Sequence, residues 1–248
     1  MTRWLMGLAV LALSLVANPA MAEVVDVELV LAVDVSGSID AYEFNLQRKG
    51  YSEAFRDPRV LDAIRANKLQ RIAVTMVEWS GAEFQAQIVP WTVVRDRASA
   101  EALAAAILAP PRGPGRWTSI SGGIDYSMKL FRESPHKSER RVIDVSGDGV
   151  NNSGRPVEMA RDEALKAGVI INGLAILNDR PNPYSGFYRQ PESQQPLGEY
   201  FSEKVIGGPG SFLISTNDFE GFERAVVVKL VREIAGIEIK PASGFAAR

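Results

Sequence analysis

Short apolar segments alternate with segments of helical period along most of this chain, and this alternation restricts the fold more than any other feature. Strands are predicted at 24–33, 72–79, 84–91, 141–146, 169–177 and 211–215. Helices are predicted between Asp40 and Pro58, at 98–108, 120–131, 156–167 and 198–205, and from Asn217 to Gly236. Strands that alternate with helices predict a mostly parallel sheet with helices on both faces.

One connection departs from this pattern. Only four residues separate the strands predicted at 72–79 and 84–91, so these two strands are expected to form a hairpin. The predicted fold class is therefore α/β: a Rossmann-like, doubly wound, mostly parallel six-stranded sheet with one antiparallel edge strand. No repeat or linker divides the chain, so a single domain is predicted over 23–240, followed by a frayed tail at 241–248.

The N-terminal segment resembles an export signal. Arg3 precedes an apolar run at 4–17, and Ala20, Met21 and Ala22 form a small-residue cleavage pattern. The run is shorter than the roughly 20 residues that a membrane-spanning helix needs. We therefore expect residues 1–22 to be a signal peptide that is cleaved near Ala22. The mature chain is then periplasmic or secreted, with no stable insertion into the membrane.

Composition excludes several classes of site. The chain has no cysteine and one histidine, His136, so thiolate zinc sites, cysteine nucleophiles and two-histidine metal sites are excluded. Its formal net charge of −2 argues against nonspecific electrostatic binding of nucleic acid by the whole domain. An exported chain without disulfides must be held together by its core, and 46% hydrophobic residues supply enough material for one.

Polar side chains follow the first predicted strand. That buried, apolar strand leads into Asp34-Val35-Ser36-Gly37-Ser38, which carries three oxygen-bearing side chains. Buried polar groups need partners, and carboxylate and hydroxyl oxygens suit a hard cation such as Mg²⁺, Mn²⁺ or Ca²⁺. The alternative is an ordinary turn that caps the next helix, because turns favour aspartate, serine and glycine.

Two further loops favour the metal interpretation. Thr118 precedes the helix predicted at 120–131, and Asp148 follows the strand predicted at 141–146. In a parallel sheet this strand is expected beside the first one, so their carboxyl ends share the edge where ligands bind. The candidate ligands are Asp34, Ser36, Ser38, Thr118 and Asp148. Their two carboxylates roughly neutralise one divalent ion.

These three motifs together resemble the metal-ion-dependent adhesion site of von Willebrand factor A (VWA) domains, over roughly 23–236. The resemblance implies that Ser36 and Ser38 contact the metal directly. It implies that Asp34 and Asp148 bind directly or through water, and that Thr118 binds in at least one conformational state. It further implies a remaining position for a carboxylate of a protein partner, with Mg²⁺ as the expected ion, Mn²⁺ or Ca²⁺ as alternatives, and no catalysis.

One position departs from the family pattern. Family members commonly carry a hydroxyl residue before the aspartate of the third loop, and this chain has Gly147, which puts the usual geometry around Asp148 in question. The version found here, Ile143-Asp144-Val145-Ser146-Gly147-Asp148, together with the signal peptide resembles an exported bacterial branch of unknown function.

Three more polar residues are candidates to support the metal ligands: Glu78, Asp144 and Asn151. An acid inside a strand is costly unless it is paired. Glu78 and Asp144 therefore have a second interpretation, as buried salt bridges to an arginine such as Arg71 or Arg141. Neither interpretation is favoured by the sequence.

The surface that meets the partner is predicted from exposed aromatic residues. Tyr184, Phe187 and Tyr188 lie in a long segment without helical or strand period, and Trp117 precedes Thr118. Aromatic side chains on loops are effective interface anchors. Alternatively, these rings pack against the domain and only cover a helix end.

Two other functions stay open. A metal-dependent phosphoester hydrolase would use Asp34 as its nucleophile, but the usual pattern has an acid two residues later, where this chain has Ser36. A purely structural divalent-metal site would stabilise the fold without engaging a partner. The sequence names neither the partner nor the oligomeric state.

Overall fold

The computed structural model describes residues 23–177, 195–217 and 221–236. The proposed signal peptide, the tail at 241–248, and Tyr184, Phe187 and Tyr188 lie outside the described residues. The strands are β1 (Val27–Asp34), β2 (Ile72–Trp79), β3 (Gln85–Val94), β4 (Arg141–Gly147), β5 (Val169–Ile176) and β6 (Leu213–Thr216). The helices are α1 (Ala41–Arg56), α2 (Pro58–Arg65), α3 (Arg97–Leu108), α4 (Ile120–Glu133), α5 (Val157–Lys166), α6 (Leu197–Tyr200), the π-helical turn η1 (Phe201–Val205) and α7 (Phe222–Ala235).

The six strands form one sheet in the order β3-β2-β1-β4-β5-β6. All neighbours are parallel except β2 and β3, which form the antiparallel hairpin at one edge. The predicted α/β fold class is therefore confirmed. The register pairs Val33 of β1 with Ser146 of β4, so these two central strands end at the same edge of the sheet.

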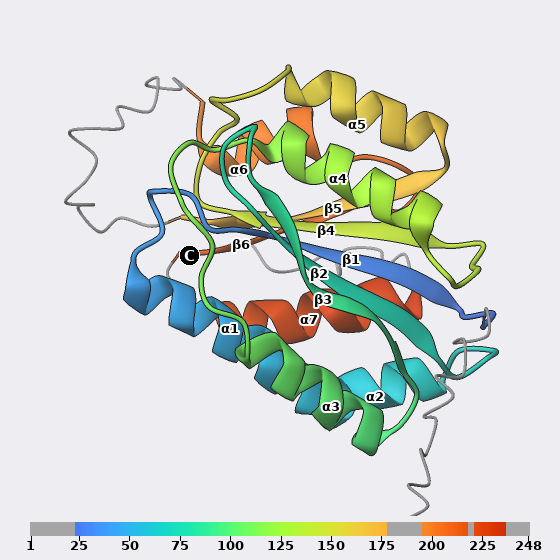
Figure 1. Cartoon of the computed structure of the whole chain (residues 1–248). Helices are drawn as coiled ribbons and strands as arrows, with labels where there is room; N and C mark the ends of the chain where they lie inside the picture. Colours follow the sequence, from blue (N-terminus) through green and yellow to red (C-terminus); the bar gives the residue numbers. More distant parts are fainter. Residues whose placement is uncertain (1–22, 178–194, 218–220, 237–248) are drawn as a thin grey trace, which may run out of the picture.

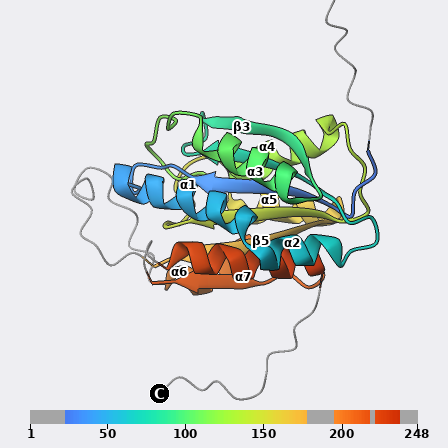
Figure 2. The same cartoon turned by 90° about the horizontal axis from the view of Figure 1, so that it is seen from below.

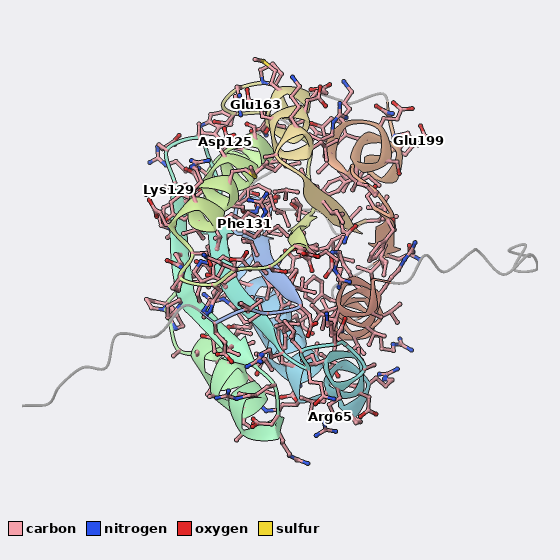
Figure 3. All side chains as sticks on the ribbon, turned by 90° about the vertical axis from the view of Figure 1, so that its right-hand side faces the viewer. Arg65, Asp125, Lys129, Phe131, Glu163 and Glu199 are labelled. Carbon is pink, nitrogen blue, oxygen red and sulfur yellow. The ribbon has the colours of Figure 1, made fainter. Side chains whose placement is uncertain are left out.

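Helices cover both faces of the sheet (Figure 1). One layer contains α1, α2, α3 and α7, and Figure 2 shows α1, α2 and α7 from that side. The other layer contains α4, α5 and α6. Figure 3 places Phe131 of α4 toward the sheet, and Asp125 and Glu163 farther out, where Arg155 bonds to both. Two apolar clusters, one beneath each layer, hold the helices to the sheet.

Local sequence explains where the first helices begin and end. Asp40 and Glu43 form the predicted capping box at the start of α1. The first helix stops before Pro58 as expected, but Pro58 also begins α2, a helix that was not predicted from the sequence. Proline is well suited to the first position of a helix because its nitrogen has no hydrogen to leave unpaired there. Asp57 caps α2 by accepting a hydrogen bond from the Arg59 backbone.

The last helix begins later than predicted. Asn217 was expected to cap it, but α7 begins at Phe222, and its N-cap residue, Gly221, makes no side-chain capping bond. Its end agrees with the sequence: Gly236 adopts a left-handed conformation with φ of 63°. The first strand also begins later, at Val27, because Val24 only forms an isolated bridge with Lys137. Among the described residues, no helix has the length and apolar character needed to cross a membrane.

Candidate metal centre

Two acidic residues meet at the carboxyl edge of the sheet. Asp34 is the last residue of β1, and Asp148 directly follows β4, its parallel neighbour. Both strands are almost wholly buried, so each acid stands where a buried strand ends and a loop begins. This edge is where α/β sheets usually hold their ligands.

A chain of hydrogen bonds joins the first and third loops. The Ser36 and Ser38 hydroxyl oxygens are 3.0 Å apart, and the Ser38 hydroxyl donates to Asp148 Oδ1 at 2.6 Å. The backbone N–H of Ser36 donates to Asp34 Oδ1 at 2.7 Å. The structure thus brings together four of the five candidate ligands, from two loops that are 110 residues apart in sequence.

The second oxygen of Asp34 is the one that fits a cation. Asp34 is fully buried, and its Oδ2 has no hydrogen-bond partner. A buried carboxylate oxygen without a partner is destabilising, and a hard cation is a natural partner for it. A Cβ at Gly147 would lie 3.0 Å from this oxygen. The departure from the family pattern at position 147 therefore leaves space beside Asp34.

Burial raises the pKa of both acids, and Asp148 adds to the rise at Asp34. Burial, and then the negative charge of Asp148, raise the pKa of Asp34 to about 8. Burial raises the pKa of Asp148 to about 6, with Glu43 adding to the rise and the Ser38 hydrogen bond opposing it. Two carboxyl groups with raised pKa values favour a proton or a cation between them. A bound divalent ion would lower both pKa values.

Thr118 lies in the second loop, which contacts both the first and the third loop. Its side chain is buried, and its backbone N–H donates to Asn152 Oδ1 at 2.9 Å. Its loop contacts the first loop through Gly37, whose N–H donates to the Arg116 carbonyl at 3.0 Å.

Asn151 joins the third loop to the start of α4 and does not support the two acids directly. Its Oδ1 accepts from the Ser121 N–H at 3.0 Å, and its Nδ2 donates to the carbonyls of Ser153 and Arg155. The start of α4 and the loop after β4 are thereby held together next to Thr118. Asn151 makes no hydrogen bond to Asp34 or Asp148.

Glu78 and Asp144 form buried salt bridges, but not with the arginines named from the sequence. Glu78 Oε1 lies 2.6 Å from Arg48 Nη2 of α1. Asp144 Oδ1 lies 2.8 Å from Lys229 Nζ of α7, with both side chains fully buried. Arg71 and Arg141 were therefore the wrong partners. Asp144 faces the α7 layer, away from the candidate metal centre.

Arg112, which was not predicted from the sequence, holds the first loop through its backbone carbonyls. Its Nη2 donates to the backbone carbonyls of Val35 at 3.2 Å, Ser36 at 3.1 Å and Ile39 at 2.6 Å. Glu78 anchors the same segment, because its Oε2 accepts from the Gly113 N–H at 3.0 Å. An arginine in a loop rich in proline and glycine was the only signal for this role in the sequence.

Of the residues predicted for a partner surface, Trp117 lies within the described part of the chain. Trp117 is 43% exposed and follows Arg116, whose carbonyl contacts the first loop. Within the described part of the chain, no three His, Cys, Asp or Glu residues form a group that could hold a metal ion. The candidate centre contains two acids, so hydroxyl groups and water would have to complete the coordination of an ion.

Comparisons with known proteins agree on the fold. Residues 23–238 match a family described as "Protein of unknown function (DUF1194)". No curated protein sequence matches significantly. Among solved structures, proximal thread matrix protein 1 from the mussel byssus, with a zinc-occupied MIDAS motif, has a TM-score of 0.59 and 15% identity. That match covers 87% of this chain and 50% of the other, so the chain spans about half of that protein's length.

Two bacterial structures are similar as well. An aerotolerance-related membrane protein from Bacteroides fragilis has a TM-score of 0.56 and 18% identity, over 85% of this chain and 100% of the other. A von Willebrand factor type A structure from Catenulispora acidiphila has a TM-score of 0.56 and 13% identity, over 86% of this chain and 43% of the other. Identities this low show a common fold of VWA type and leave ligands and partners open.

Proposed function

This chain belongs to the DUF1194 family, whose description names no function, and from its own site we propose that it is a VWA-like binding module. The module holds one divalent cation at the carboxyl edge of β1 and β4. The cation engages an acidic group of a protein partner. Mg²⁺ is the proposed ion, because the donors are carboxylate and hydroxyl oxygens, which suit hard cations.

The observation that carries this proposal is the unpartnered Oδ2 of buried Asp34, next to the chain of Ser36, Ser38 and Asp148. These four residues would hold the ion, with Thr118 joining them from the second loop. A bound ion would provide the attachment point for a carboxylate oxygen of the partner. The zinc-occupied MIDAS motif of the mussel protein supports the view that this fold accommodates a divalent ion there.

The proposed module does not catalyse a reaction. A hydrolase of the usual pattern that used Asp34 as nucleophile would carry an acid two positions later as its general acid or base, and this chain has Ser36 there. We further propose that the module is a single exported domain at 23–240, released by cleavage near Ala22. The Bacteroides relative, described as a membrane protein, is compatible with a role outside the cytoplasm.

Calorimetric titration of the chelator-stripped protein with Mg²⁺, Mn²⁺ and Ca²⁺ tests the metal centre. We expect saturable, one-to-one binding that is lost in Asp34→Asn. Asp62→Asn is the matched control, because Asp62 is an exposed acid on α2 with a side chain 72% exposed. Absence of binding to the wild type, or binding that survives Asp34→Asn, would contradict the proposal.

Partner binding needs a separate measurement, since a purely structural ion would also bind. Peptides that contain glutamate or aspartate can be compared with their amide counterparts on immobilised protein, in Mg²⁺ and in chelator. The proposal expects retention of acidic peptides only in Mg²⁺, and loss of retention in Asp34→Asn. Metal binding without any preference for acidic peptides would instead identify the ion as structural.

A further inference from the structure

Three ionisable side chains meet beneath the sheet, in a place that the proposed function does not use. Lys229 Nζ of α7 lies 2.8 Å from Asp144 Oδ1 of β4, and it also donates to Glu233 Oε1, one turn further along α7. All three side chains are fully buried. Because Asp144 faces the α7 layer, this cluster is separate from the candidate metal centre in the loops after β1 and β4.

The charges of this cluster do not balance. One ammonium group faces two carboxyl groups, so an ion pair can neutralise only one of them. Burial raises the pKa of Asp144, and burial together with the charge of Asp144 raises the pKa of Glu233 to about 7. Buried charges are costly, and the transfer of one proton from the ammonium to a carboxylate removes a pair of them. The result is a neutral amine in contact with a neutral carboxylic acid, the two groups from which an amide forms.

The surroundings of the cluster keep these groups in place and away from water. The centre of the Phe212 ring lies 5.6 Å from Lys229 Nζ, and Asp144 belongs to a strand that is almost wholly buried. Asn172 Nδ2 of β5 donates to Glu233 Oε1 at 3.0 Å, which fixes that carboxyl group. Exclusion of bulk water also protects a newly formed amide from hydrolysis.

We propose that Lys229 and Asp144 condense in the folded protein to form an amide cross-link between α7 and β4. Lys229 Nζ, as the neutral amine, attacks Asp144 Cγ, so one N–C bond forms and one C–O bond of the carboxyl group breaks. The nitrogen gives up one proton and the leaving hydroxyl takes up one, so water is the only other product. Glu233 contacts Lys229 Nζ and is hydrogen-bonded with Asp144, so it accepts the first proton and donates the second. The step needs no oxidant, reductant or co-reactant.

The two acids have different roles because their surroundings differ. The hydrogen bond from Asn172 favours the ionised form of Glu233, which suits a group that accepts a proton. Among the described residues, no amide N–H donates to either oxygen of Asp144. Asp144 therefore lacks this support for its ionised form, and it is the acid that reacts.

The cross-link gives the chain a covalent fastening that cysteine cannot supply, because the sequence contains no cysteine. An amide between Asp144 and Lys229 closes a loop that contains β5 and β6. Closure of a loop restricts the unfolded chain and stabilises the folded one, as a disulfide does. The central strand β4 and the last helix would then stay joined even in denaturant.

Mass spectrometry of the purified protein, with its N-terminus determined, tests the cross-link directly. We expect a mass below that of the sequence by one water. After tryptic digestion, the peptide with Asp144 should be joined to the peptide with Lys229, without cleavage after Lys229. This branched peptide distinguishes the cross-link from loss of water within a single peptide. Separate Asp144 and Lys229 peptides overturn the proposal, and so does an amide to Glu233 in place of Asp144.

Variants test the role of each group. Glu233→Gln should keep its full mass, because the amide side chain cannot carry the proton from Lys229 to the leaving hydroxyl. Its fold should survive, since Lys229 and Asp144 remain as a simple ion pair, and a melting curve checks this. Lys229→Met should keep its full mass as well. Glu223→Gln, an exposed position on the same helix, is the matched control and should lose one water like the wild type. Cross-linking of Glu233→Gln to the same extent as the wild type overturns the assigned role of Glu233.

Discussion

At the scale of single residues, the two oxygens of Asp34 have different surroundings. Oδ1 accepts a hydrogen bond from its own loop, and Oδ2 is buried without a partner beside Gly147. The first oxygen fixes the side chain, and the second remains available for an ion. Gly147 therefore contributes to the site by leaving space for an ion beside Asp34 Oδ2.

Gly147→Ala should weaken cation binding by about tenfold or more, because its Cβ would lie 3.0 Å from Asp34 Oδ2 and displace it. Overpacking of this kind usually costs about 1–3 kcal/mol of stability, so the fold should survive. Metal titration and thermal melting measure the two effects. Gly198→Ala is the control, since the nearest atom to its Cβ would be 3.6 Å away. Unchanged metal affinity in Gly147→Ala would refute this role of Gly147.

Arg112 acts on the same site through the backbone. Arg112→Met removes the donor shared by the carbonyls of Val35, Ser36 and Ile39, so we expect a loss of stability of about 1–3 kcal/mol. Because these carbonyls set the course of the first loop, Mg²⁺ affinity should fall as well. Arg116→Gln, in the same loop with an exposed side chain, should change neither quantity. A variant that unfolds more easily but binds Mg²⁺ normally would reduce Arg112 to a purely structural role.

The sequence indicated the ligands better than it indicated their supports. Asp34, Ser36 and Ser38 stand in one short motif after a strand, and the parallel sheet then determines which strand places Asp148 beside them. Arg48 and Lys229, which pair with Glu78 and Asp144, carry no such local pattern. Their partners are set by how α1 and α7 pack on the sheet, which no spacing within a motif reveals.

At the scale of elements, the buried face of α7 includes charged residues as well as the apolar stripe that the sequence shows. Lys229 and Glu233 are one turn apart and would pass for an exposed pair in the sequence, yet both are buried under the sheet. There they meet Asp144, so one cation faces two acids. Burial, and then the charge of Asp144, raise the pKa of Glu233 to about 7.

This arrangement predicts a pH dependence of stability. The ordinary pKa of a glutamate is 4.5, so between that pH and about 7 folded Glu233 keeps a proton that the unfolded chain has released. The free energy of unfolding should therefore fall as pH rises through this window, by up to about 3 kcal/mol. Urea unfolding of wild type and Glu233→Gln across the window measures the effect, which the variant should lack. Glu223→Gln, an exposed position on α7, should behave like the wild type.

Element boundaries show where local signals are ambiguous. Pro58 was interpreted only as a stop, although a proline that ends one helix also suits the first turn of the next. Asn217 has the right chemistry for a cap, but α7 begins at Phe222 after Gly221. In both cases the residue type was compatible with two placements, and tertiary packing selected between them. The alternation of strands and helices has no such ambiguity, which is why the sheet as a whole was predicted correctly.

At the scale of the whole molecule, the order β3-β2-β1-β4-β5-β6 places β1 and β4 at the centre of the sheet. Their carboxyl ends carry the candidate metal centre. The candidate metal centre is therefore built on two central, almost wholly buried strands. Ion binding at this centre should stabilise the entire domain, because the central strands are separated only when the sheet unfolds.

Metal binding can therefore be followed through global unfolding. Mg²⁺ at about 100 times its dissociation constant should add about 2.7 kcal/mol of stability, which for a domain of this size raises the melting temperature by roughly 5–10 °C. Asp34→Asn should show no such rise. Without metal, however, Asp34→Asn should melt at or above the wild-type temperature, because the amide replaces a buried acid whose ionisation is unfavourable there. Thermal scans of both proteins in chelator and in Mg²⁺ test both expectations. An equal rise of melting temperature in wild type and Asp34→Asn on adding Mg²⁺ would show that the ion binds elsewhere.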